Sequence, residues 1–214
     1  MNRHASLGPV RVLRWSALLG LLIAGLTAAP ALASTSITDS PPASLDGTPC
    51  TPLTFSQTLL SAGDSAWYTM LPGESPDQLA GTGWALSGGA AIKTTTLADG
   101  TTGQVLDLPS GASAFTPPVC IDEGFQEARA EVTDIKGSEG IFFYIQPWGT
   151  NDWGSAQNTG QIHNSGWTLS GEMNLNDTVP GWELVRFEFK AGGNVNHPSE
   201  FQMYNFWLDP HMMR

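Results

Sequence analysis

The chain has 214 residues, a formal net charge of −11 at pH 7 and 14% charged residues. This length is enough for one domain with a sizeable apolar core. The excess of acidic residues argues against nucleic acid and anionic membrane surfaces as partners, because both are bound through patches of Lys and Arg.

The first 33 residues predict a secretory signal peptide. Three arginines precede the apolar run SALLGLLIAGLTA, and the small-residue sequence Ala31-Leu32-Ala33 follows it. The run is shorter than the roughly 20 residues that a membrane-spanning helix needs. We therefore expect a secreted, extracellular protein with no membrane insertion after cleavage. Because none of the acidic residues lies in the signal, the remaining chain carries a net charge of −14.

Residues 34–49 predict a flexible leader. Their sequence, STSITDSPPASLDGTP, is rich in Ser, Thr, Pro and Asp and has little apolar mass. Such a segment cannot bury enough surface to offset its ordering entropy. The domain organisation expected is a signal peptide, this leader and a single domain over residues 50–214.

Cys50 and Cys120 are the two cysteines of the chain, and both lie in the exported part. Oxidation is the default there, so we expect one disulfide. Closing a loop of this length stabilises a protein by about 4 kcal/mol in the chain-entropy model. A catalytic thiol is the alternative, which the absence of a flanking His disfavours.

The stretch GTGWALSGGAAIK, residues 81–93, surrounds Trp84 with small residues. Alternation gives one face the bulky indole and leaves the other face nearly bare. This pattern is typical of a strand that packs its indole inward while another backbone crosses close behind. We favour a core position for Trp84 over a ligand contact, with Gly88-Gly89 turning the chain into the next strand.

Apolar residues after the first cysteine recur with a period of two, which is typical of half-buried strands. The clearest case is GWELVRFEFK, residues 181–190. Here Val185, Phe187 and Phe189 share one face, and mostly charged residues share the other.

Three further segments predict strands: residues 128–135 alternate, whereas residues 139–148 and 200–209 are apolar on both faces and should lie centrally. Turn signals rich in Gly, Pro and Asp separate the segments, and the 24 glycines disfavour helices. The sequence therefore predicts an all-β fold, an antiparallel β-sandwich of jelly-roll type.

The loop QPWGTNDWGSAQNTGQ, residues 146–161, contains the strongest candidate for ligand binding. Trp148 and Trp153 lie among polar residues that include Asn151 and Asp152. Indole faces stack on the C–H faces of sugars while amides and carboxylates bond the hydroxyls, so this mixture points to glycan binding. The alternative is that one indole caps the sandwich core.

A hydrolase is a second hypothesis. Gly63-Asp64-Ser65, residues 149–152 and residues 209–211 resemble, in order, the blocks of GDS-type esterases, which would make Ser65 the nucleophile. That family places its Ser after a parallel strand of an α/β sheet, whereas LLSAG precedes it here. We expect neither His163 nor His211 to lie within hydrogen-bond reach of Ser65.

Acidic residues suggest two other sites. Asp122, Glu123 and Glu127 are candidates for the carboxylate pair of a glycosidase. Calcium could be held by loop carboxylates, with Asp122 and Asp209 as the candidate metal ligands. The sequence has no phosphate-binding loop and no HExxH motif, so no other cofactor is expected.

The order of several motifs resembles a group of uncharacterised secreted actinobacterial proteins. The motifs are GDSAWYTMLPGES, GWALSGGAAI, LDLPSGASAFTPPVC, GW-x-x-V-x-F-x-F and FWLDPHMMR. The resemblance covers nearly the whole exported chain and implies export and a β-sandwich. It implies no activity and no site residues.

These observations favour a secreted, non-catalytic binding or interaction module. The expected partner is a glycan, either a cell-wall polysaccharide or another component of the cell envelope. The alternatives are a secreted hydrolase that uses Ser65 or a carboxylate pair, and a structural envelope protein with no small ligand.

Overall fold

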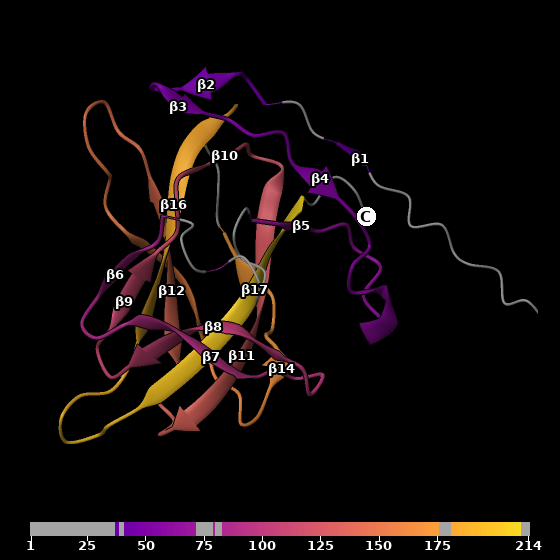
Figure 1. Ribbon diagram of the computed structural model, residues 1–214. Coiled ribbons are helices and arrows are strands. Elements are labelled where there is room, and N and C mark those ends of the chain that lie inside the picture. Colours follow the sequence, from indigo (N-terminus) through magenta and orange to yellow (C-terminus); the bar gives the residue numbers. More distant parts are fainter. Residues whose placement is uncertain (1–36, 39–40, 72–78, 80–82, 176–180, 211–214) are drawn as a thin grey trace, which may run out of the picture. The chain divides into compact units, whose positions relative to one another are not determined.

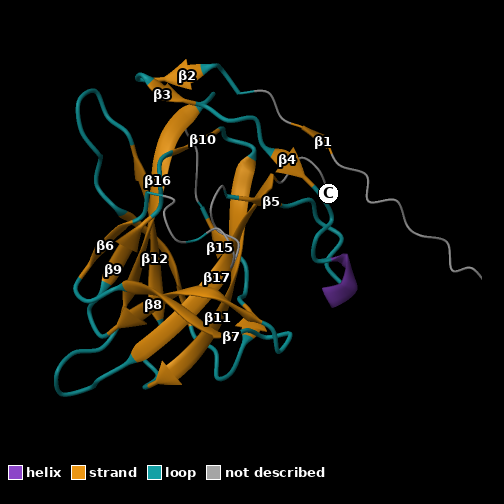
Figure 2. Cartoon of the chain, in the orientation of Figure 1, coloured by secondary structure: helices purple, strands orange, loops and turns teal. Residues whose placement is uncertain are grey.

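The computed structural model describes residues 37–38, 41–71, 79, 83–175 and 181–210. Strands make up nearly all of its regular structure (Figure 2), and a short 3₁₀ turn, Leu60–Ala62, is the one helical element of the described residues. No helix in this part of the chain is long and apolar enough to cross a membrane.

Two antiparallel sheets form the body of the fold (Figure 1). The first, here called the β16 sheet, has the order β13-β12-β16-β9-β6, and β10 also pairs with β16. Its strands are β6 (Ala85–Ser87), β9 (Ser113–Phe115), β10 (Val119–Ile121), β12 (Ile141–Pro147), β13 (Gln157–Ile162) and β16 (Glu183–Ala191).

The second sheet, here called the β17 sheet, has the order β14-β11-β17-β8-β7, with β15 beside β11 and β5 beside β17. Its strands are β5 (Thr69–Met70), β7 (Ala91–Thr96), β8 (Thr102–Pro109), β11 (Phe125–Lys136), β14 (Thr168–Leu169), β15 (Met173–Asn174) and β17 (Glu200–Pro210). The chain passes repeatedly from one sheet to the other, as in a jelly roll. The predicted all-β antiparallel sandwich is confirmed.

The core lies between the two sheets and is built from the alternation that the sequence shows. Phe187 and Phe189 of β16 are fully buried, and both pack against Phe206 of β17 with ring centroids 5.1 and 5.0 Å apart. Phe143 of the central strand β12 joins the same cluster, 5.4 Å from Phe206. Edge-to-face packing of this kind adds to the burial of each ring.

Trp84 lies just before β6 and packs against the core, with its ring centroid 6.1 Å from that of Phe189. The indole is partly buried, which agrees with the core interpretation. Gly88 and Gly89 have φ values of 64° and 93° and turn the chain from β6 into β7. A Cβ on Gly88 would lie 2.9 Å from the Cα of Ala112, so a second backbone does cross closely here.

The segment before the first cysteine carries ordered structure. Strands β2 (Ser44–Leu45) and β3 (Thr48–Pro49) pair as a hairpin, and β1 (Ile37–Thr38) pairs with β4 (Thr54–Phe55). Leu45 packs against a cluster that contains both cysteines. Regular structure thus begins within the stretch whose composition predicts a flexible leader, because the neighbouring domain supplies the apolar surface that the stretch itself lacks.

Candidate functional site

The outer side of β12 presents aromatic and amide groups rather than a purely polar surface. Phe142, Tyr144 and Gln146 are partly exposed, while Phe143 and Ile145 between them point into the core. This follows from the two-residue period of a strand. A segment that is apolar on both faces in sequence therefore places an aromatic row on the outside of the sandwich.

Strands β16 and β9 extend the same side of the sheet. The register sets Glu188 of β16 beside both Tyr144 of β12 and Phe115 of β9, and it sets Arg186 beside Gln146. All five side chains are partly exposed. Because cross-strand neighbours lie about 5 Å apart, the five side chains form one contiguous surface.

Trp148 and Trp153 lie at the end of this surface, on a tight loop that follows β12. The two residues form a β-bridge, and their rings meet edge to face with centroids 5.1 Å apart. The backbone N–H of Gly149 donates to the carbonyl of Asp152 at 2.8 Å, which closes the turn. The structure therefore brings the two predicted indoles together, and both are partly exposed.

Arg186 joins the indoles to the sheet. Its guanidinium carbon lies 4.4 Å from the ring centroid of Trp153 and 4.3 Å from that of Phe115, so the cation is sandwiched between two aromatic rings. Its Nε also donates to Oε1 of Gln146 at 2.7 Å. Burial lowers the pKa of Arg186, while Glu188 and Asp152 act in the opposite direction. The group stays charged because the ordinary value is far above neutrality.

The surface formed by these residues is called the aromatic face below. It comprises Phe115, Tyr144, Gln146, Trp148, Trp153, Arg186 and Glu188. Tyr144 and Trp148 are four residues apart, which corresponds to about 14 Å along a strand. The aromatic face is thus long enough for a short oligosaccharide.

The other two predicted ligand residues, Asn151 and Asp152, lie at the exposed tip of the loop. The Oδ1 atom of Asp152 accepts a hydrogen bond from the backbone N–H of Trp153 at 2.7 Å. This contact orders the loop beside the indole, and the carboxylate keeps room for further donors. Asn151 is exposed next to it.

A small apolar cluster supports the loop from below. Cys50 and Cys120 form the predicted disulfide, with their Cα atoms 5.6 Å apart. They pack with Leu184, and Trp148 and Trp153 pack against this cluster in turn. Trp148 therefore has a structural role at the end of the sheet as well as an exposed edge.

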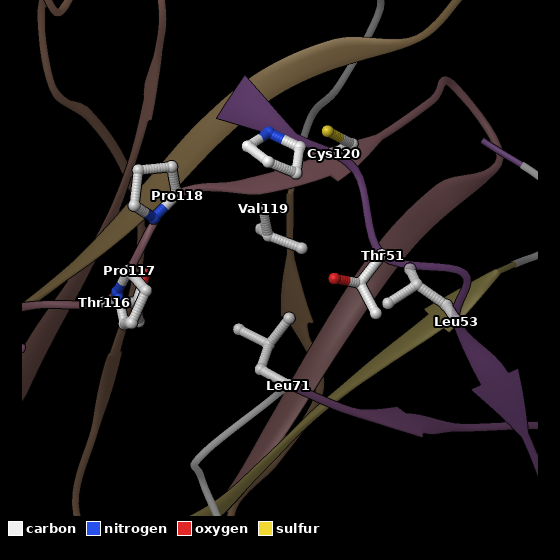
Figure 3. Close-up of a pocket in the computed structure, with 9 residues that line it drawn as sticks. Thr51, Leu53, Leu71, Thr116, Pro117, Pro118, Val119 and Cys120 are labelled. Atoms are coloured by element: carbon white, nitrogen blue, oxygen red, sulfur yellow. The ribbon is translucent and has the colours of Figure 1, made fainter. Parts of the chain in front are cut away.

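The cavity beside the disulfide is too small for a sugar (Figure 3). It has a volume of about 50 Å³, and the side chains of Leu53, Leu71 and Val119 converge on it. Prolines 117 and 118 line its rim. A space of this size holds one or two water molecules.

The esterase-like block at Gly63-Asp64-Ser65 lies in a turn of the chain after the 3₁₀ helix. Asp64 is engaged by three donors: the backbone N–H of Ala66 at 3.0 Å, the Tyr68 hydroxyl at 2.8 Å and Nη1 of Arg129 at 2.6 Å. No hydrogen bond joins the Ser65 side chain to a histidine among the described residues. His211 lies outside them. Asp64 thus acts as the centre of a structural ion pair.

We expect Asp64→Ala to lower the free energy of unfolding by about 2 kcal/mol at pH 7, since it removes bonds to a charged group. Burial raises the pKa of Asp64, but its three donors outweigh burial and hold the pKa below its usual range. A lowered folded-state pKa stabilises above the unfolded value of about 3.9, and this contribution is lost as pH falls through the folded-state value.

Urea unfolding at pH 7 and pH 3 measures this effect. The difference between wild type and Asp64→Ala should shrink at pH 3, while the control Glu139→Ala, at an exposed position, should stay close to wild type at both. An equal difference at the two pH values would contradict the ion-pair interpretation.

The acidic candidates Asp122 and Glu123 share the turn between β10 and β11, and Glu127 lies on β11. Asp122 accepts from the backbone N–H of Gly124 at 2.9 Å, and Glu123 accepts from that of Gly181 at 2.6 Å. Glu127 lies opposite Asp209 in the pairing of β11 with β17. The described residues contain no group of three or more His, Cys, Asp or Glu that could hold a metal ion.

Phe115, Tyr144 and Arg186 were not predicted as site residues. The alternation in residues 181–190 places Arg186 on the outer face, which was a usable signal. Its contact with Phe115 could not be predicted, because it depends on β9 pairing with β16 some 70 residues away in sequence. Tyr144 could not be singled out in the sequence, because the residues of its strand are apolar on both faces.

Comparison with known proteins found no matching family model and no match among curated proteins. Among solved structures, the chain is similar to a family 11 carbohydrate-binding module from Clostridium thermocellum in complex with a β-1,3-1,4-mixed-linked tetrasaccharide. The identity is 16%, over 66% of this chain and 94% of that one, with a TM-score of 0.38.

It is also similar to CBM29_1, a family 29 carbohydrate-binding module from Piromyces equi, with 16% identity over 69% of this chain and 92% of that one and a TM-score of 0.39. A third is the CBM22-1 xylan-binding domain of Paenibacillus barcinonensis Xyn10C, with 15% identity over 64% and 88% and a TM-score of 0.38. These identities and scores are too low to transfer a ligand or a residue role to this chain.

Proposed function

We propose that this chain is a secreted, non-catalytic module that binds glycan through the aromatic face. The observation that carries the proposal is the position of Arg186. Its guanidinium is stacked between Trp153 and Phe115 on the outer side of the β16 sheet, where all three side chains are partly exposed. Aromatic rings, an amide and charged groups thus share one partly exposed surface.

The chemistry of this surface matches that of a sugar. A pyranose ring offers C–H patches that pack on aromatic rings, and hydroxyls that both donate and accept hydrogen bonds. Tyr144 and Trp153 supply ring surface, while the Gln146 amide and the Glu188 carboxylate supply polar partners. Glu188 already accepts from the Ser113 hydroxyl at 2.8 Å, and a carboxylate has room for further donors.

The surface is also held in place before a ligand arrives. Arg186 is fixed by its bond to Gln146 and by two rings, and the loop of Trp153 is closed by hydrogen bonds within its own turn. Groups that are already ordered lose little conformational entropy on binding, which favours affinity. A rigid surface of this kind suits recognition of an extended polysaccharide.

Export supports the choice of an extracellular partner. The signal-like first 33 residues direct a chain out of the cell, and the Cys50–Cys120 disulfide persists in oxidising surroundings. The partner in this proposal is therefore a polysaccharide of the cell wall or its surroundings.

Retention on insoluble cellulose, xylan and purified bacterial cell walls tests the proposal. Wild type should be retained on at least one of them, and Tyr144→Ala should weaken retention about tenfold, which corresponds to about 1.4 kcal/mol. Tyr144→Phe keeps the ring and should bind like wild type. Ile135→Ala changes an exposed apolar residue of the other sheet and is the second control.

Two results would refute the proposal. One is failure of the wild type to bind any of the three materials. The other is binding that is unchanged in Tyr144→Ala while its melting temperature stays that of wild type.

A further inference from the structure

Arg186, in the aromatic face, has donors that no protein group uses. Among the described residues, its side chain makes one hydrogen bond, from Nε to Gln146. The buried side-chain nitrogens of that part of the chain that lack a partner are Nε1 of Trp84 and Nε1 of Trp207. Because Nη1 and Nη2 of Arg186 also lack a partner but are not among these buried atoms, both reach the solvent. The outer edge of the guanidinium can therefore donate to a ligand.

The charge of Arg186 is also unpaired. Lys93 and Arg129 each form an ion pair with a carboxylate, whereas Arg186 and Lys190 form none within the described residues. Lys190 is exposed and, by the two-residue period of a strand, lies on the same side of β16 as Arg186. Two unpaired cations thus share one face of a strand in an exported chain whose net charge is −14.

A glycan that stacks on Trp153 and Tyr144 would cover the guanidinium of Arg186 and exclude water from it. The group is already partly desolvated, because burial lowers its pKa and Phe115 and Trp153 lie against it. A neutral sugar would leave a covered cation without a counter-charge, which is costly, whereas an acid group on the ligand compensates the charge. A carboxylate or a phosphate can accept two parallel hydrogen bonds from the planar pair Nη1 and Nη2.

Carboxylates near Arg186 restrict how acidic the ligand can be. The charges of Glu188 and Asp152 oppose the effect of burial on the pKa of Arg186, so both lie within electrostatic range. Glu188 accepts from the Ser113 hydroxyl and Asp152 from the backbone N–H of Trp153. These carboxylates would repel the further acid groups of a dense polyanion. Acidic residues elsewhere matter less, because at 0.15 M salt exposed charges are screened beyond about 8 Å.

We propose that the aromatic face selects a glycan whose acid-bearing sugars are spaced along an otherwise neutral chain, with one acid group accepting hydrogen bonds from Nη1 and Nη2 of Arg186. This selectivity rests on the glycan binding proposed above. The aromatic rings hold neutral sugars, and Lys190, about 14 Å further along β16, attracts a second acid group.

Matched ligands test the role of the acid group. Glucuronoxylan carries carboxylates at intervals along a neutral xylan chain, and reducing them to alcohols gives the neutral counterpart. Wild type should bind the native polymer about tenfold more tightly than the reduced one in affinity electrophoresis, as expected for charge-assisted hydrogen bonds.

Phosphate is tested in the same way with purified bacterial cell walls, before and after hydrofluoric acid removes their teichoic acids. A preference for the acidic form in either pair supports the proposal and identifies the acid group. Polygalacturonate, a dense polyanion, should bind more weakly than the preferred acidic ligand. Stronger binding of polygalacturonate would contradict the spacing of the acid groups.

Arg186→Gln is the decisive variant, and its preference for the acidic form should disappear. Arg186→Lys keeps the charge without the planar fork and should keep part of the preference. Lys136→Gln changes the net charge equally at an exposed position of β11, in the other sheet, and should keep all of it. Each preference compares two ligands on one variant, so a general loss of binding from disturbed packing around Trp153 does not imitate the effect.

The outcomes separate this selectivity from glycan binding itself. Equal binding of the acidic and neutral forms by wild type in both pairs would overturn the selectivity and leave glycan binding intact. Binding to none of the polymers would overturn both. The selectivity also fails if Arg186→Gln keeps the preference, or if Lys136→Gln loses it. If Arg186→Gln does not fold, the wild-type preference and its reduction in Arg186→Lys decide.

Discussion

Replacing both Cys50 and Cys120 with Ser is expected to lower the free energy of unfolding by about 4 kcal/mol. The two residues are 70 positions apart, and cross-linking a loop of that length removes much of the conformational entropy of the unfolded chain. A domain has a total stability of about 5 to 15 kcal/mol, so the loss is a large share of it. No other single covalent link holds the β2–β3 region to β10 in the described residues.

Urea unfolding of the oxidised wild type and of the double Ser variant measures this difference. Wild type unfolded in the presence of a reductant should match the variant, which controls for the polarity of the new serines. A loss below about 1 kcal/mol would show that the contacts of Leu45 and Leu184 around the sulfurs hold the region without the link.

The sandwich could be predicted because its signal is local. Val185, Phe187 and Phe189 are buried and alternate with the partly exposed Arg186 and Glu188, and that alternation of apolar and charged residues predicts a buried face. The disulfide could be predicted equally well, since the two cysteines of an exported chain can pair only with each other. Both features depend on composition and period and on no long-range register.

Only half of the candidate site could be predicted from the sequence, because the other half depends on which strands pair. Trp148 and Trp153 stand out in sequence because indoles are unusual in a polar loop. Their partner Arg186 comes from β16, and Phe115 comes from β9, so their meeting depends on which strands pair.

The two indoles of the loop are expected to differ in what they contribute. Trp148 packs against the cluster around the disulfide, and truncation to Ala removes this packing. Trp148→Ala should therefore lower the free energy of unfolding by about 2 to 3 kcal/mol, somewhat less than a fully buried Trp would. Trp153 packs against the same cluster, but its ring also lies on a cation that is itself partly exposed, and we expect Trp153→Ala to cost less, about 1 kcal/mol.

Retention on polysaccharide should show the reverse order, with a larger loss in Trp153→Ala than in Trp148→Ala. Trp153→Ala removes one of the two rings that hold Arg186 and also removes ring surface from the aromatic face, so retention on polysaccharide should fall about 100-fold, equivalent to about 2.7 kcal/mol. Trp153→Phe keeps a ring over the guanidinium and should recover most of the retention. Thermal melts run beside the retention assay separate the two effects. If Trp153→Ala lost stability but kept full retention, the indole would be a cap on the sheet and the glycan would have to bind elsewhere.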